Sequence, residues 1–218
     1  KYQPVTSQNR IPLVTNGTVD LECGSTTNNA TRQKDVAFAV TTYVEEVRIA
    51  TKTNSGINGI KDLNGKTVAT TTGTTSVQTL RKNERATGID FKNVLGKDHA
   101  DSFLLLETGR ADAFVMDGSI LAANISKAKS PADFHIVGEV LSVDPIACMI
   151  PKDDPAFKAA VDGVLTKLMQ SGEMEKIYTK WFVNPIPPKN MSLNLPLGTT
   201  LRQLFATPND KPLETYQQ

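Results

Sequence analysis

Apolar, strand-like stretches alternate with polar turns and helical stretches along the chain. Residues 8–15 have a short helical pattern and residues 19–22 a short strand pattern. Residues 37–51 are rich in β-branched side chains, which favours one or two long strands over a helix. From residue 66 onward the alternation is regular. It predicts strands at 67–70, 92–95, 113–116, 135–137 and 147–150, and helices at 76–88, 101–107 and 119–127.

The strongest helical pattern follows Asp154 and Pro155, which are typical of an N-cap and of the first position of a helix. Apolar side chains then recur with the 3.6-residue period of one helix face, at Phe157, Val161, Val164, Leu165 and Leu168. Gly172 interrupts this face before a second amphipathic stretch. The tail is rich in proline, so we expect it to be extended, with one short helix near 201–205.

Strands that alternate with helices predict an α/β architecture with mainly parallel sheets. The alternation starts twice, which predicts two lobes joined near residues 41–49. A length of 218 residues suffices for two small lobes. The 24 basic and 23 acidic residues nearly balance, which argues against a nucleic-acid-binding surface. No apolar run approaches the roughly 20 residues that span a bilayer, so we expect a soluble globular protein.

Metal binding is not expected from the cysteines and histidines. Cys23 and Cys148 are the only cysteines, and His99 and His135 are the only histidines. Their spacings fit none of the usual zinc patterns. The count allows either one disulfide or two separate thiols, and the sequence leaves both open.

Three polar junctions between strands and helices carry the candidate chemistry. Residues 70–76 form a turn of hydroxyl side chains around Gly73, and backbone N–H groups before a helix favour an anion such as a carboxylate or a phosphate. The polar loop 24–29 precedes Arg32, and Ser7 precedes Arg10 by about one helical turn. A guanidinium suits bidentate carboxylate binding. The carboxyl ends of strands form the ligand crevice of open α/β sheets, so the three junctions are expected to converge. The alternatives are an ordinary capping loop and solvated surface arginines.

Two catalytic motifs are only superficially present. Residues 59–67 have one residue too many between the glycines for a P-loop, and they precede their strand instead of following it. His99, Asp101 and Ser102 lie too close together in the sequence for a catalytic triad, and the chain has no Gly-x-Ser-x-Gly elbow. Neither motif predicts an enzyme.

Six segments carry a more specific pattern. They are TSQNRIP at 6–12, ECGSTTNN at 22–29, DLNGKTV at 62–68, GTTS at 73–76, KDHADSF at 97–103 and WFVNPIPPKN at 181–190. Together they resemble the bacterial periplasmic polar-amino-acid-binding proteins of ABC importers, most closely the glutamate/aspartate-binding subgroup. The resemblance extends over essentially the whole chain.

This resemblance implies a type II periplasmic-binding-protein fold, a two-lobed clamshell that closes on one amino acid. Lobe 1 would be discontinuous, with residues 1–45 and 184–218, and lobe 2 would be residues 46–183. The protein would reside in the periplasm, bind L-glutamate or L-aspartate without a cofactor, and deliver it to membrane permease subunits. It would not be an enzyme.

The resemblance also implies the roles of individual residues toward the backbone of the ligand. Arg32, with Ser25 and Thr27, would hold the α-carboxylate. Thr75 would add a contact from the other lobe. Asp117 would pair with the α-ammonium group.

The side-chain carboxylate of glutamate or aspartate would be held by Ser7, Arg10 and His99. These assignments agree with the chemistry expected above, since cationic and N–H-rich groups suit two carboxylates and one acid suits the ammonium group. Glutamate and aspartate present the same two carboxylates one methylene apart, so the sequence does not separate them.

Two departures from the family pattern affect these expectations. The family begins lobe 1 with a strand, a loop carrying another ligand-binding arginine, and a helix, all before the position of Lys1. Lobe 1 is therefore expected to be incomplete, because the chain is truncated, because it was cleaved, or because another chain supplies the segment. Gly118 also stands where relatives often have a second acid.

The alternative function is a dehydratase-type enzyme on the same clamshell, because one fold supports several functions. Such an enzyme needs an acid or base placed against the bond that breaks. The candidates in the inferred cleft, His99 and Asp117, already have ligand-holding roles. We therefore expect a binding protein.

Overall fold

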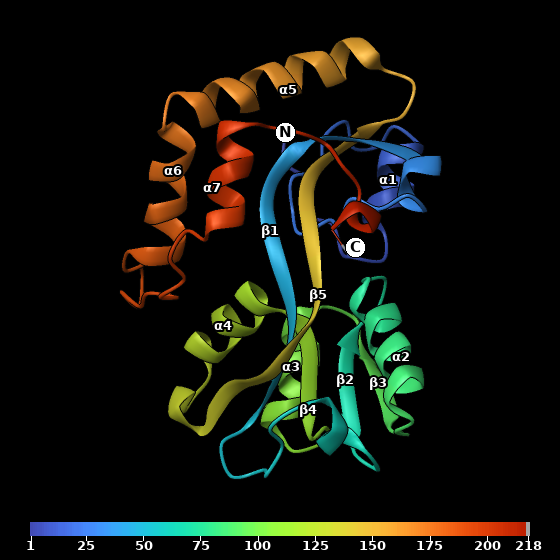
Figure 1. The fold of residues 1–218 in the computed structure, drawn as a ribbon, viewed down its shortest axis with the longest axis vertical. Helices are drawn as coiled ribbons and strands as arrows, with labels where there is room; N and C mark the ends of the chain where they lie inside the picture. Colours follow the sequence, from blue (N-terminus) through green and yellow to red (C-terminus); the bar gives the residue numbers. More distant parts are fainter. Residues whose placement is uncertain (217–218) are drawn as a thin grey trace. The chain divides into compact units, whose positions relative to one another are not determined.

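The computed structural model describes residues 1–216 and forms two compact units (Figure 1). Unit 1 comprises residues 1–5, 9–45 and those from 143 onward; unit 2 comprises residues 6–8 and 46–142. The strands β1 (Val36–Lys52) and β5 (Phe134–Pro151) each contribute residues to both units. The long β-branched segment therefore forms one continuous strand.

A mixed sheet with the strand order β3-β2-β4-β1-β5 organises unit 2. β2 (Thr67–Thr71) runs parallel to β3 (Lys92–Gly96) and to β4 (Ala113–Asp117), whereas β1 is antiparallel to β4. The expectation of parallel pairing is thus correct for three strands and wrong for β1. The chain passes from β1 to β2 through the short 3-10 turn η2 (Ile60–Leu63), without the crossover helix that commonly joins parallel strands.

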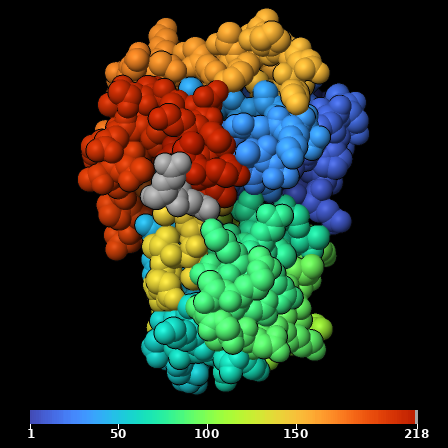
Figure 2. Space-filling view, turned by 45° about the vertical axis from the view of Figure 1, so that its right-hand side comes forward, coloured from blue at the N-terminus to red at the C-terminus, as the bar shows by residue number. Residues whose placement is uncertain are grey.

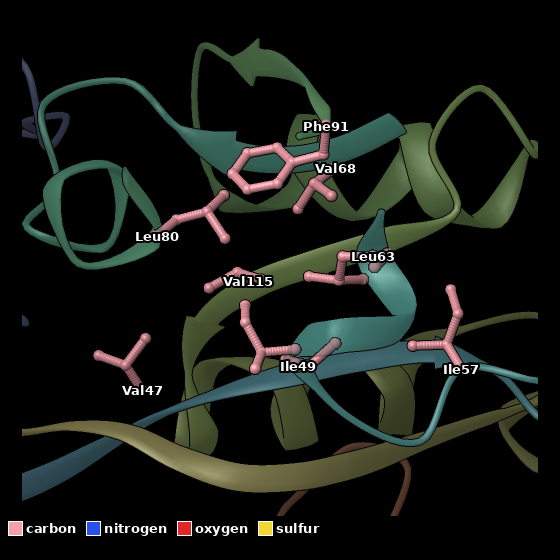
Figure 3. Close-up of a cluster of buried hydrophobic side chains, with 10 residues drawn as sticks. Val47, Ile49, Ile57, Leu63, Val68, Leu80, Phe91 and Val115 are labelled. Carbon is pink, nitrogen blue, oxygen red and sulfur yellow. The ribbon is translucent and has the colours of Figure 1, made fainter. Parts of the chain in front are cut away.

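Helices cover both faces of this sheet. Val68 and Ala69 point to opposite faces, as the two-residue period of a strand requires. Val68 belongs to an apolar cluster with Leu80 of α2 (Figure 3), whereas Ala69 belongs to one with Leu106 of α3 and Leu121 of α4. The helices of unit 2 are α2 (Ser76–Thr87), α3 (His99–Glu107) and α4 (Gly118–Lys127), with the 3-10 turn η3 (Pro131–Asp133).

An apolar cluster in unit 1 contains side chains from four elements, including Val40 of β1, Met169 of α5, Tyr178 of α6 and Leu201 of α7. Asp162 of α5 also accepts a hydrogen bond from the backbone N–H of Val40 at 2.8 Å. The elements of unit 1 outside the shared strands are α1 (Arg10–Thr15), η1 (Arg32–Lys34), α5 (Pro155–Gln170), α6 (Glu173–Tyr178), the π-helical turn η4 (Thr179–Val183), α7 (Thr199–Ala206) and η5 (Leu213–Thr215).

The expected lobes, residues 1–45 with 184–218 and residues 46–183, stay a prediction. In the structure, residues 46–142 and residues 6–8 belong to unit 2, whereas residues 143–183 belong to unit 1. The physical reason is the packing of α5 and α6 against β1 and α7. The sequence does not signal this change, because the chain passes from unit 2 to unit 1 inside the single strand β5, without a turn.

Three smaller expectations also change. Residues 19–22 form only an isolated bridge, between Glu22 and Met149, and the two strands expected between 135 and 150 are one strand, β5. Helix α3 begins at His99, two residues earlier than expected, because Asp98 is its N-cap. The side chain of Asp98 accepts the N–H of Asp101 at 2.8 Å.

Cys23 and Cys148 form a disulfide in unit 1, which decides the alternative that the sequence left open. They are 125 residues apart in the sequence and lie beside the bridge between Glu22 and Met149. The bond therefore ties the loop before β1 to the unit 1 end of β5. Among residues 1–216, no helix is both long and apolar enough to cross a membrane.

Removal of this disulfide should destabilise unit 1. The Cys23→Ala/Cys148→Ala double variant should lose about 2–5 kcal/mol of unfolding free energy, because the cross-link closes a long loop in the unfolded chain. Hydrogen exchange followed by mass spectrometry should show the loss in β5 residues near Cys148. Equal protection in the variant and in the oxidised wild type would contradict a stabilising role, and reduction of the wild type provides the control.

Candidate functional site

The carboxyl ends of three parallel strands lie at one edge of the sheet in unit 2. β2 ends at Thr71, β3 at Gly96 and β4 at Asp117, and Thr71 is paired directly with Gly96. The segments after these strand ends contain the turn 72–75 and the start of α3, where His99 lies. Thr75, His99 and Asp117 therefore gather at the same edge of the sheet in unit 2.

The turn after β2 is tightly folded around Gly73. The carbonyl oxygen of Thr71 accepts hydrogen bonds from the N–H and the hydroxyl of Thr74, at 3.3 and 2.8 Å. Gly73 has a φ of +80°, and a Cβ there would lie 2.7 Å from the Cα of Gln8 and 2.8 Å from the carbonyl carbon of Ser7. This close approach places Ser7 beside the turn that leads to Thr75.

His99 is held by a chain of hydroxyl groups. Its Nδ1 lies 3.1 Å from Oγ1 of Thr71, which lies 2.8 Å from Oγ of Ser102. Ser102 Oγ also lies 3.1 and 3.0 Å from the carbonyl oxygens of Thr70 and Asp98, which can only accept its single proton. When Ser102 donates to either of them, Thr71 is the donor to Ser102 and the acceptor from Nδ1 of His99.

This arrangement differs from a catalytic triad, in agreement with the sequence analysis. The carboxylate of Asp101 accepts the backbone N–H of Lys97 at 3.0 Å, and Ser102 is completely buried. The serine therefore positions the histidine through Thr71. The close approach of Ser102 to β3 requires glycine at position 96, because a Cβ on Gly96 would collide with Ser102.

Asp117 is a buried acid at the end of β4. Only 4% of its surface is exposed, and its side chain does not cap the helix α4 that follows. A buried carboxylate requires a cationic or hydrogen-bonding partner.

In unit 1, the structure brings Arg32 and Thr27 into direct contact. Nη1 of Arg32 donates to the carbonyl oxygen of Thr27 at 2.9 Å, and the backbone N–H of Arg32 donates to the side chain of Asn29 at 2.8 Å. The buried hydroxyl of Thr27 donates to Oδ2 of Asp144 at 3.1 Å. The guanidinium and the backbone of Arg32 are therefore each held by a hydrogen bond within the same loop.

The turn that contains Ser25 is organised by Glu22. The buried carboxylate of Glu22 accepts the N–H of Gly24 at 2.7 Å and the hydroxyl of Thr26 at 2.5 Å. A Cβ on Gly24 would collide with this carboxylate. Ser25 is half-buried between the two residues that Glu22 binds.

Arg10 begins helix α1 and is only 4% exposed. It lies in unit 1, whereas Ser7 and His99 lie in unit 2. The eight predicted residues therefore form two groups, each described within its own unit. Unit 1 contains Arg10, Ser25, Thr27 and Arg32, and unit 2 contains Ser7, Thr75, His99 and Asp117.

The supporting roles of Glu22, Ser102 and Asp144 were not predicted from the sequence. All three are buried: Asp144 accepts a hydrogen bond from Thr27, Glu22 binds the residues on either side of Ser25, and Ser102 binds Thr71, the partner of His99. Gly24 could have indicated the position of the Glu22 side chain, and Gly96 that of Ser102. In each case the glycine has no Cβ where that side chain lies. Nothing in the local sequence signals Asp144. Among residues 1–216, no three His, Cys, Asp or Glu side chains are grouped to hold a metal ion.

The chain is similar to transport proteins of three bacteria. It is 48% identical over 213 residues to the glutamate/aspartate import solute-binding protein of Salmonella typhimurium, covering 98% of this chain and 70% of the relative. It is 47% identical to the protein of the same name from Escherichia coli K12, with the same coverage. It is also 47% identical to an L-glutamate/L-aspartate-binding protein of Pseudomonas aeruginosa, covering 98% of this chain and 71% of the relative.

Solved structures agree with the expected fold. An ancestral arginine-binding protein bound to arginine superposes with a TM-score of 0.76 at 28% identity, covering 84% of this chain and 80% of that one. A mutant of ArgBP from T. maritima gives a TM-score of 0.75 at 29% identity, covering 83% and 76%. The family model of bacterial extracellular solute-binding proteins, family 3, matches residues 1–184, and the chain belongs to this family.

Proposed function

We propose that this chain binds L-glutamate or L-aspartate as the solute-binding protein of an amino-acid ABC importer. The observation that carries the proposal is the 48% identity, over 98% of the chain, to a glutamate/aspartate import solute-binding protein. The chemistry of the two groups agrees with a ligand that has two carboxylates and one ammonium group, since they contain two arginines, one histidine and one buried acid.

In unit 1, Arg32 would hold the α-carboxylate of the ligand together with Ser25 and Thr27. A guanidinium has five N–H donors in a planar fork, and the donor to the carbonyl oxygen of Thr27 fixes the orientation of that fork. The hydroxyl proton of Thr27 is directed at Asp144. Thr27 therefore supports the carboxylate through its hold on Arg32 more than through its own hydroxyl.

In unit 2, Asp117 would pair with the α-ammonium group and Thr75 would contact the ligand from the start of α2. His99, with Ser7 and with Arg10 of unit 1, would hold the side-chain carboxylate. Thr71 contacts Nδ1 of His99, so a contact with this carboxylate would use Nε2, which donates a hydrogen bond only when it carries a proton. Both groups would thus contribute to one ligand.

The remaining parts of the proposal concern location and partners. The periplasm and the permease subunits of an importer are the expected setting, given the extracellular family and the import names of the relatives. A dehydratase-type activity has no comparable support, since the relatives described above are named for binding or import. The chain spans about 70% of the length of these relatives.

A thermal-shift screen of the twenty amino acids tests the proposed ligand. L-Glutamate and L-aspartate at about 100 times Kd should raise Tm by about 5–10 °C, because a ligand that binds the folded state stabilises it by ~2.7 kcal/mol at that concentration. The neutral and basic amino acids should give smaller shifts. A larger shift with arginine or leucine would sink the proposal.

Two arginine variants test the assignment of the two carboxylates. Arg32→Ala should weaken binding of both ligands by about 2–5 kcal/mol, because a desolvated carboxylate loses its charged partner. Arg10→Ala should instead shift selectivity toward glutamine, which lacks the side-chain charge. Calorimetric titration with glutamate, aspartate and glutamine measures both effects, and circular dichroism controls for folding. Wild-type affinity in Arg32→Ala would remove Arg32 from the site.

A pair of glycine variants tests the approach of Ser7 to the turn in unit 2. Gly73 and Gly65 have similar positive φ values of +80° and +72°, but a Cβ on Gly65 meets nothing within 4 Å. Gly65→Ala should destabilise the fold by about 1 kcal/mol, because the left-handed backbone disfavours a Cβ, and Gly73→Ala should destabilise it more, because its Cβ also meets the backbone of Ser7 and Gln8. Only Gly73→Ala should also weaken glutamate binding, since its Cβ displaces Ser7 and Gln8. Equal affinities in the two variants would contradict this arrangement.

A further inference from the structure

We infer that the C-terminal residues 209–216, here called the strap, position the carboxylate-binding loop 27–32 and so set the affinity for the ligand. The inference rests on the proposed function, since it concerns the loop that carries Arg32. The sequence predicts only that this part of the proline-rich tail is extended. Figure 2 shows the C-terminal residues, in red, packed against the blue surface of the N-terminal part of unit 1.

Asn28 is the residue through which the strap holds the loop. Asn28 is completely buried, and it lies in the loop between Thr27 and Arg32. Its side-chain amide donates to the carbonyl oxygen of Asp210 at 2.9 Å, and its own carbonyl oxygen accepts the N–H of Leu213 at 2.9 Å. Two hydrogen bonds of this one residue therefore end on the strap.

Asn28 also has two bonds outside the strap. Its backbone N–H donates to the carbonyl oxygen of Pro145, and its side-chain oxygen accepts the amide of Gln33 at 2.8 Å. The second bond reaches the residue after Arg32. A shift of Asn28 would consequently move both ends of the loop that fixes the guanidinium.

Glu214 makes a second contact between the strap and the loop. Its carboxylate oxygens lie 3.1 and 3.3 Å from the backbone N–H of Ala30, two residues before Arg32. The glutamate side chain is exposed, so it has no part in the apolar core. Its carboxylate is thus a hydrogen-bond acceptor for the backbone of the loop.

The strap is itself anchored to two regular elements of unit 1. The carbonyl oxygen of Asn209 accepts the N–H of Thr41 in β1 at 2.8 Å. Lys158 of α5 lies 2.9 Å from Asp210 and 2.7 Å from Asp162. Burial acts to lower the pKa of Lys158, but the hydrogen bonds to Asp162 and Asp210 raise it above its ordinary value, so the lysine stays charged.

These contacts form a continuous route from β1 and α5, through the strap, to the loop of Arg32. A loop held in its binding conformation before the ligand arrives loses less entropy on binding. Glu214 and Asn28 thus act as positioning residues. They affect the affinity for the ligand through the position in which they hold Arg32.

Calorimetric titration of L-glutamate into the full chain and its Glu214 variants tests the inference. Glu214→Ala should raise Kd about 3- to 10-fold, the range expected for the loss of one hydrogen bond. Glu214→Gln keeps an acceptor oxygen for Ala30, so its Kd should stay within about 2-fold of the wild type. Glu175→Ala is the matched control, because Glu175 is also an exposed acid of unit 1, paired with Arg202 at 2.7 Å. It should leave Kd unchanged.

A double-mutant cycle shows whether the effect passes through Arg32. Arg32→Lys keeps the charge but loses the planar fork, so its weaker binding remains measurable. In that background Glu214→Ala should change Kd less than about 2-fold, because the geometry it protects is already lost. A full effect in both backgrounds, tighter binding in either Glu214 variant, or an effect equal to that of Glu175→Ala would overturn the inference. Absence of glutamate binding in the wild type would instead refute the proposed function.

Discussion

The parallel pairing of β2 with β3 and β4 is the constraint on which the candidate site of unit 2 depends. Parallel strands end at the same edge of a sheet, so three separate segments deliver Thr75, His99 and Asp117 to one place. If β3 or β4 ran the other way, its polar residue would lie at the opposite edge. The close contact at Gly96 depends on the same geometry, because the pairing of Thr71 with Gly96 brings Ser102 to Thr71.

Unit 1 positions its polar groups by a different physical principle. The loop of unit 1 that carries Arg32 does not follow a regular strand. It is held instead by hydrogen bonds to side chains that are buried or distant in the sequence. Glu22 and Asp144 accept hydroxyl protons of neighbouring threonines, and the strap accepts and donates at Asn28. Loss of one partner leaves a buried polar group unsatisfied, at about 1–3 kcal/mol, so the network defines one conformation of the loop.

Local patterns in the sequence were sufficient for most of unit 2. The alternation of strands and helices and the polar turn after β2 predicted the elements and their shared edge. The same patterns failed where partners are distant in the chain. Asp144 lies 117 residues from Thr27, and Glu214 lies 184 residues from Ala30.

Two other features have no local signal for related reasons. The disulfide joins residues 125 apart, and the cysteine count alone left one disulfide or two separate thiols open. The passage from unit 2 to unit 1 lies inside β5, which carries the chain between the units without a turn. The roles of the eight site residues came from the family resemblance. The structure adds the contacts that hold Arg32 and His99 in place.

Hydrogen exchange with and without L-glutamate tests the central claim most directly, because it reports on both units in one experiment. The claim is that the loop of Arg32 and the strand-end edge of unit 2 both contact the ligand. Saturating glutamate should slow exchange at residues 25–32 and also at residues 72–76 and 98–100, while the apolar clusters of both units stay unchanged. Protection confined to one unit, or protection only at surfaces remote from these segments, would contradict the account.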